Sequence, residues 1–242
     1  MQSARDTLES GCLHEGSYRL TLNALNDYPA QAFVPRNYEP SYPYPLLVFF
    51  HSNGSNEEEA LRLAPLLSRR NYVCLSLRGS QPAGEREDGS PLFNWEGDRA
   101  PEAWLDDYLH SAIRQLRRHI HIHTERVYLV GTREGATPAA SLALRFPQHF
   151  AGFVSLNGFL RRESLPPMRL SEIRHLRVLL AHGSKNKAMP INRLYDELRL
   201  LLTGGVSVQL SSYPTNERLQ SQMLIDLNRW LMKGIDTSIA VA

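Results

Sequence analysis

Apolar runs alternate with amphipathic segments along most of the chain. The run LLVFF at 46–50 is apolar throughout, which is typical of a strand buried on both faces of a mainly parallel sheet. The segment 102–120 instead repeats apolar residues every three or four positions, which predicts a helix with one face on the core. Strands that alternate with such helices indicate an α/β protein with a mainly parallel sheet and helices on both faces. The expected strands are 18–25, 30–35, 46–50, 72–77, 126–130, 152–156, 177–182 and 206–213; the expected helices are 55–70, 102–120, one after the turn at 131–135, 190–204 and 216–234.

We expect one domain over residues 1–242, with loose tails at 1–16 and 235–242. A chain of 242 residues with 42% hydrophobic content can bury a single sizeable core. The polar stretch 78–101 has no periodic pattern, and loops of that length are uncommon unless they cover a site or are flexible. Phe93 and Trp95 would dock over the pocket if this stretch is a lid, and a flexible insert is the alternative.

Charge and cysteine content narrow the class of protein. The chain has 27 basic and 25 acidic residues, a net charge of +2, without a long run of one sign, so we expect no nucleic-acid partner. Cys12 and Cys74 are too few for a disulfide framework. No secretory signal is visible near the first residue, and no apolar run is long enough to span a membrane. A cytoplasmic location is the expectation, and we predict no cofactor and no metal.

The segment VYLVGTREGA at 127–136 carries the main chemical clue. A buried strand leads into a turn bounded by Gly131 and Gly135, and a helix follows. This is the setting of a nucleophile elbow, where small residues allow strand and helix to pack closely around a strained central residue. The central residue here is Arg133.

With these residues in place, the chain resembles the α/β-hydrolases, and most of all the phospholipase/carboxylesterase and dienelactone-hydrolase-like group. The resemblance covers roughly residues 44–233 and implies a single-domain α/β-hydrolase fold. It rests on LLVFFHSNGSNEEE as the oxyanion loop after its strand, IHTERVYLVGTREGA as the elbow, FAGFVSLNG as the next strand, VLLAHGSKNKAMP as the acid loop and YPTNERL as the histidine loop. Ser52 stands where the oxyanion loop usually has glycine.

The same comparison implies that the Ser-Asp-His triad is missing. Its three positions hold Arg133, Asn186 and Glu217, and the last histidine of the chain is His182. An arginine stays protonated, so it is neither a nucleophile nor a base. Losing one triad member already lowers the rate by several powers of ten. The leading interpretation is therefore a non-catalytic binding or interaction module, whose partner is a protein or a small anionic ligand.

Two roles for Arg133 are open. In the preferred one it plugs the pocket by an ion pair with Glu217, with Asn186 hydrogen-bonded to the pair. In the other it faces a carboxylate or phosphate, beside backbone N–H groups of Asn53 and Glu134 that would form the former oxyanion hole.

The remaining candidates are histidines and hydroxyl groups. His51 and His182 could line the pocket, although hydrogen bonds to the loops are the favoured role. The stretch HIHIH, which contains His119, His121 and His123, has spacing that could suit zinc, but a surface connector is favoured.

Two other functions remain open. A carboxylesterase or phospholipase-type hydrolase could act through an unrecognised nucleophile, for which Ser155 and Thr132 are the nearest hydroxyls. The chain could also be a structural subunit of an active relative.

Overall fold

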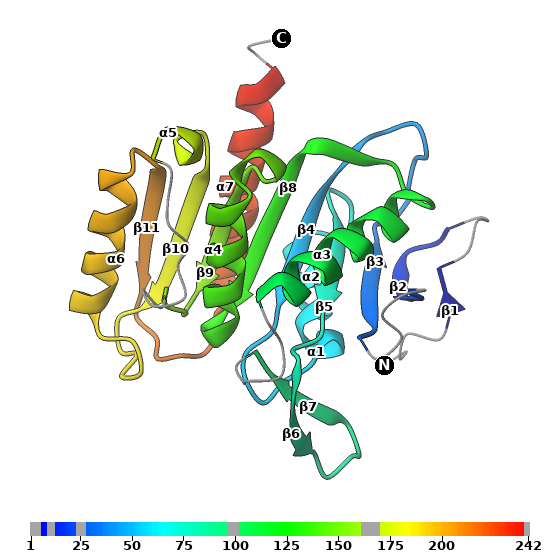
Figure 1. Ribbon diagram of the computed structural model, residues 1–242, viewed down its shortest axis with the longest axis horizontal. Helices are drawn as coiled ribbons and strands as arrows, with labels where there is room; N and C mark the ends of the chain where they lie inside the picture. The colour runs from blue at the N-terminus through cyan, green and yellow to red at the C-terminus, as the bar shows by residue number, and fades with distance from the viewer. Residues whose placement is uncertain (1–5, 9–12, 23–27, 96–101, 161–169, 240–242) are drawn as a thin grey trace.

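The computed structural model describes residues 6–8, 13–22, 28–95, 102–160 and 170–239. Within these residues one twisted sheet of nine strands runs through the molecule in the order β1-β2-β3-β5-β4-β8-β9-β10-β11 (Figure 1). The pairs from β5 to β11 are parallel, whereas β3 is antiparallel to both β2 and β5. The strands are β1 (Asp6–Thr7), β2 (Gly16–Leu20), β3 (Ala30–Val34), β4 (Tyr44–Phe50), β5 (Val73–Leu77), β8 (Ile122–Thr132), β9 (Gly152–Leu156), β10 (Arg177–Gly183) and β11 (Ser207–Tyr213).

Helices cover both faces of the sheet and form two cores with it (Figure 1). Every residue of β4 is buried, because Val48 and Phe50 enter one core while Leu47 and Phe49 enter the other. This explains why an uninterrupted apolar run marks a central strand. The first core is covered by α3 (Glu102–Arg117), α4 (Ala136–Arg145), α5 (Leu170–Ile173) and α6 (Ile191–Thr203), and the second by α1 (Glu57–Leu61), α2 (Leu63–Leu67) and α7 (Ser221–Ile239).

The predicted α/β class, the parallel sheet and the two helical layers are confirmed, but some boundaries were wrong. The expected helix 55–70 breaks at Arg62 into α1 and α2, because Pro65 has no N–H with which to continue the helical ladder. Asn56 caps α1 by accepting a hydrogen bond from the backbone of Glu59, as its side chain allows.

Both expected tails contain ordered elements. In the first sixteen residues, β1 pairs with β2 and Leu8 is buried. At the other end, α7 begins at Ser221 and continues to Ile239, five residues later than expected at each end. Cys12 lies outside the described residues.

The stretch that follows β5 is not a patternless loop. It folds into a hairpin of β6 (Gln81–Glu85) and β7 (Pro91–Asn94), which projects from the carboxyl edge of the sheet (Figure 1). Its strands were missed because they are short and neither alternates buried with exposed positions: β6 is mostly exposed, and β7 is mostly half-buried. Residues 96–101 of this stretch are not described.

Candidate functional site at the carboxyl edge of the sheet

The elbow between β8 and α4 has the geometry that its glycines predict. A Cβ atom on Gly131 would come within 2.3 Å of Ala136, and one on Gly135 within 2.4 Å of the Phe50 carbonyl oxygen. Only glycine therefore allows the turn to pack so closely against β4. Between them, Arg133 has a φ of +50°, a conformation that non-glycine residues rarely adopt. The backbone of this elbow is strained at its central residue.

The side chain of Arg133 is not paired as expected. Its Nη2 atom lies 3.7 Å from Oε1 of the adjacent Glu134, and 42% of the side chain is exposed. Glu217 is exposed and forms no ion pair with Arg133. The predicted Arg133–Glu217 pair was wrong, because the carboxylate nearest to the guanidinium belongs to the next residue of the elbow itself.

The side chain of Glu134 also contacts the oxyanion loop. Its Oε2 atom accepts a hydrogen bond of 3.1 Å from the backbone N–H of Asn53. This N–H is one of the two donors expected to bind the substrate oxyanion. The Glu134 carboxylate therefore accepts the hydrogen bond that a bound ligand would need from the Asn53 N–H. An incoming anion would have to displace this carboxylate.

Asn186 has a structural role in its loop. The side chain is buried, and its oxygen accepts hydrogen bonds from the backbone N–H groups of Ala188 and Met189, at 3.0 and 3.2 Å. Its amide nitrogen is 3.4 Å from the carbonyl oxygen of Asn157. The expected hydrogen bond from Asn186 to an Arg133–Glu217 pair is therefore not formed, since this side chain closes a turn of its own backbone.

Asn157 was missed as a residue of this edge. It is buried at the end of β9 with a φ of +56°, and its side chain accepts from Gly183 N–H at 2.7 Å and donates to the carbonyl of Arg218 at 3.3 Å. It thus ties the loops after β10 and β11 to the end of β9. The signal was available, because asparagine before Gly158 at a strand end is a residue that tolerates positive φ.

His51 connects the oxyanion loop to the next strand end. Its Nε2 atom accepts from the Gly79 backbone N–H at 2.8 Å, and Nδ1 donates to the Ser52 carbonyl at 2.7 Å. Burial lowers the pKa of His51 to about 4, so the imidazole is neutral at pH 7. The favoured role of hydrogen bonding to the loops is confirmed for this histidine.

His182, at the end of β10, does not fit the same expectation. It is buried, yet its Nδ1 atom has no hydrogen-bond partner among the described residues. Burial lowers its pKa, which keeps the ring neutral. The predicted hydrogen bonding to the loops therefore fails at this nitrogen.

The hairpin docks on the oxyanion loop. Phe93 exchanges backbone hydrogen bonds with Gly54 and Ser55, at 3.1 and 2.8 Å. The Trp95 indole N–H donates to the carbonyl of His51 at 2.6 Å, and the two rings lie 4.8 Å apart. Up to Trp95, the segment after β5 therefore packs on the oxyanion loop and is not a free insert.

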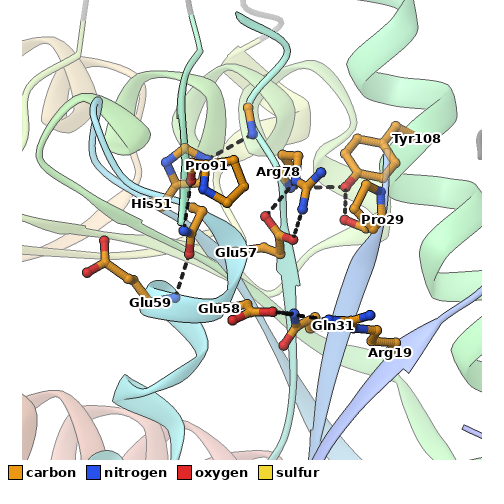
Figure 2. Close-up of polar contacts among 12 residues, drawn as sticks. Arg19, Pro29, Gln31, His51, Glu57, Glu58, Glu59, Arg78, Pro91 and Tyr108 are labelled. Atoms are coloured by element: carbon orange, nitrogen blue, oxygen red, sulfur yellow. Dashed lines mark hydrogen bonds and ion pairs between the residues drawn. The ribbon is translucent and has the colours of Figure 1, made fainter. Parts of the chain in front are cut away.

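A partly buried ion pair supports the base of the hairpin. The guanidinium of Arg78 faces the carboxylate of Glu57 with two hydrogen bonds, and Tyr108 and Pro29 lie beyond it (Figure 2). Glu57 is only 1% exposed, and the Arg78 guanidinium also stacks on the Phe93 ring at 4.5 Å. Nothing in the sequence places Arg78 beside Glu57, because the two residues are 21 positions apart in separate elements.

The other polar candidates show no catalytic arrangement among the described residues. The Thr132 hydroxyl donates to the Phe50 carbonyl at 3.2 Å, and Ser155 is 2% exposed. Cys74 is buried, which raises the pKa of its thiol. In the part of the chain that the structure describes, no three His, Cys, Asp or Glu side chains are placed to hold a metal ion. Nor is any described helix both long and apolar enough to cross a membrane.

Comparison with known proteins identifies the fold. No family model matches the chain. A protein from Nocardia uniformis subsp. tsuyamanensis, named putative esterase NocK, is 26% identical over 151 residues, which are 62% of this chain. The match covers 42% of the length of that relative.

Solved structures resemble a larger part of the chain. The Bacillus cereus carboxylesterase superposes with a TM-score of 0.65 at 20% identity, covering 85% of this chain and 93% of that one. A carboxylesterase from Mesorhizobium loti gives 0.68 at 18% identity, with 85% and 94% covered. Zea mays acyl-protein thioesterase 2 gives 0.62 at 16% identity, with 85% and 98% covered. The chain therefore has the α/β-hydrolase fold, as the sequence resemblance implied.

Proposed function

We propose that this protein is a non-catalytic member of the α/β-hydrolase fold that acts as a binding or interaction module. The observation that carries the proposal is the occupation of the oxyanion loop: the Glu134 carboxylate accepts the Asn53 N–H while Arg133 holds the nucleophile position. A site arranged in this way offers no attacking group at position 133, and one of its two expected oxyanion donors is already bonded to a carboxylate of the protein.

The chemistry of the three triad positions supports the same conclusion. A guanidinium has no nucleophilic lone pair at ordinary pH. Asn186 is committed to its own loop, and Glu217 is exposed. No histidine follows His182 in the sequence. Each of these changes alone would lower a hydrolytic rate by several powers of ten.

The internal carboxylate also bears on what the protein binds. A small anion at the elbow would compete with Glu134 for the Asn53 N–H and would be repelled by its charge. Of the two roles considered for Arg133, the plug is favoured, with Glu134 in place of Glu217. On this basis a protein partner is the better candidate at this edge.

A second candidate function is ester hydrolysis by a non-standard route. It is favoured by the names of the relatives, a putative esterase and carboxylesterases. In that case a hydroxyl such as Ser155 or Thr132 would have to attack, and a buried imidazole such as His182 would have to act as its base.

Hydrolysis of short-chain p-nitrophenyl esters distinguishes the two. Purified wild type, Arg133→Ala and Arg199→Ala would be assayed together; Arg199 serves as the control because it lies on α6 with its side chain 81% exposed. We expect all three to match buffer alone. Wild-type turnover above background would overturn the proposal. Its survival in Arg133→Ala would identify another nucleophile, and its loss there would mean that Arg133 supports the chemistry.

A further inference from the structure

A cavity at the opposite edge of the sheet has no role in the site described above. It has a volume of about 660 Å³ and lies where β8, β9 and β10 begin, beside the last turns of α7. Volumes of this size are typical of sites for small organic molecules. Two arginines, Arg126 and Arg177, line it together with three histidines and one glutamate.

The two guanidinium groups carry charge that the protein does not balance. Arg126 and Arg177 form no ion pair with a carboxylate of the described residues. Glu125 is the one carboxylate in the lining, which leaves a formal charge of +1 (two arginines less one glutamate) with neutral histidines. In a concave site, such a charge attracts an anion more strongly than on an open surface.

Both arginines also have hydrogen-bonding capacity to spare. Nε of Arg126 and Nη1 of Arg177 are buried and lack a hydrogen-bond partner in the described structure. Buried N–H groups are normally paired, so two charged ones left open beside one cavity need an explanation. An oxyanion with several acceptor oxygens would supply partners for both after a small movement of the side chains.

The scaffold holds Arg177 in position for such a role. Its Nη2 atom donates to the Trp230 carbonyl at 2.9 Å, and its guanidinium stacks on the Trp230 ring with 4.4 Å to the centroid. These contacts fix the plane of the guanidinium and use Nη2, and they leave Nη1 as the N–H group that a carboxylate or phosphate could bond.

The histidines of the lining fit the same ligand. Nδ1 of His149 lies 3.0 Å from Nε2 of His110, and Nε2 of His175 lies 2.9 Å from the carbonyl oxygen of Pro147. Burial lowers the pKa of His123 and His149, so both rings are neutral at pH 7 and add no charge of their own. Tyr128 and Phe150 also border the cavity, but both are buried in the cores of the protein.

We propose that this cavity, between the starts of β8, β9 and β10, binds a small organic anion whose phosphate or carboxylate group contacts Arg126 and Arg177. The cavity is concave and its net charge is small, which suits a small molecule rather than a polyanion such as nucleic acid. The site is independent of the elbow, so it does not rest on whether the protein hydrolyses esters.

Calorimetric titration at low salt would test the site with four probes: inorganic phosphate, phenyl phosphate, benzoate and the neutral benzamide. We expect phenyl phosphate or benzoate to bind, benzamide not to bind, and the tighter of the two anions to identify the head group. Arg126→Gln and Arg177→Gln should each weaken binding at least about tenfold, the loss expected for one charge-assisted contact. Arg199→Gln, the matched control on α6, should leave it unchanged.

Folding of each variant would be verified by circular dichroism, because Arg177 packs on Trp230. Arg126→Lys provides a second test that keeps the charge but not the planar fork, and it should bind more weakly than wild type and more tightly than Arg126→Gln. The imidazole NMR signals of His123 and His149 should shift when the anion is added to wild type. Absence of binding by every anion, or equal affinity in wild type and Arg126→Gln, would overturn the proposal.

Discussion

Replacing Arg133 by glycine should stabilise the protein relative to replacing it by alanine. Both changes remove the guanidinium and its 3.7 Å contact with Glu134, so the comparison isolates the backbone. With φ at +50°, a residue with a Cβ atom is strained by about 1–2 kcal/mol. Glycine relieves that strain but loses about 0.5–1 kcal/mol through the greater freedom of the unfolded chain.

The net difference expected is about 1 kcal/mol in favour of Arg133→Gly. Urea unfolding followed by circular dichroism would measure it, and in a protein of this size it equals about 2–4 °C in melting temperature. The same pair of changes at Arg114, an exposed residue within α3, provides the control. There alanine should be the more stable variant by about 1 kcal/mol, because glycine weakens a helix interior.

A variant Arg133→Ala that is as stable as Arg133→Gly, or more stable, would refute this reasoning. It would mean that the elbow relaxes to negative φ once the arginine is gone. The strain would then come from the side-chain contact with Glu134 and not from the packing of the turn.

Three further predictions concern packing, buried charge and pH. Gly135→Ala should lower the free energy of unfolding by about 2–3 kcal/mol or more, since its Cβ would lie 2.4 Å from a carbonyl oxygen. Gly89→Ala is the control, because a Cβ at that position would lie in open space, and it should lower the free energy less in the same urea unfolding experiment. Glu57→Gln should lower the free energy of unfolding by about 3–5 kcal/mol, because it leaves the Arg78 charge without its partner. Glu58→Gln is the control, because its ion pair with Arg19 is exposed, and it should lower the same quantity by less than about 1 kcal/mol. Equal losses of stability in the two variants would contradict this prediction. The pKa of His51 is lowered from 6.5 to about 4, so the folded state favours the neutral ring and this contribution is complete above pH 6.5. It should decline as the pH falls from 6.5 to 4, by about 3 kcal/mol in total, and wild type should lose more stability over that interval than His51→Gln.

The fold could be predicted because its signals are local. Strands such as 46–50 are apolar at every position, and the glycines of the elbow lie directly between a buried strand and a helix. The break at Arg62 could have been expected from Pro65, which sits in the middle of the proposed helix. The hairpin β6–β7 could not, since its strands are short and, among the described residues, pair with each other and with Ser55 of the oxyanion loop.

The site was predicted less well because side-chain partners depend on contacts between distant segments. The Glu134 position in the sequence suggested a backbone donor, but its carboxylate reaches Asn53 in a loop 81 residues away. Sequence spacing placed residue 217 near the site, yet it could not show that Glu217 is exposed.

The strain at Arg133 is larger than the stabilisation that its side chain provides. The Arg133–Glu134 contact is long and partly exposed, so it contributes less than about 1 kcal/mol, while the positive φ costs about 1–2 kcal/mol. The side chain therefore does not repay the strain of its own backbone. What maintains the conformation is the close packing of Gly131 on Ala136 and of Gly135 on the carbonyls of β4, which any residue at position 133 would experience. A glycine-bounded elbow after a buried strand is thus a consequence of how strand and helix pack in this fold. Such an elbow predicts the hydrolase fold whether or not its central residue can attack a substrate. The chemistry of the site depends on the residue at position 133 and on its neighbours.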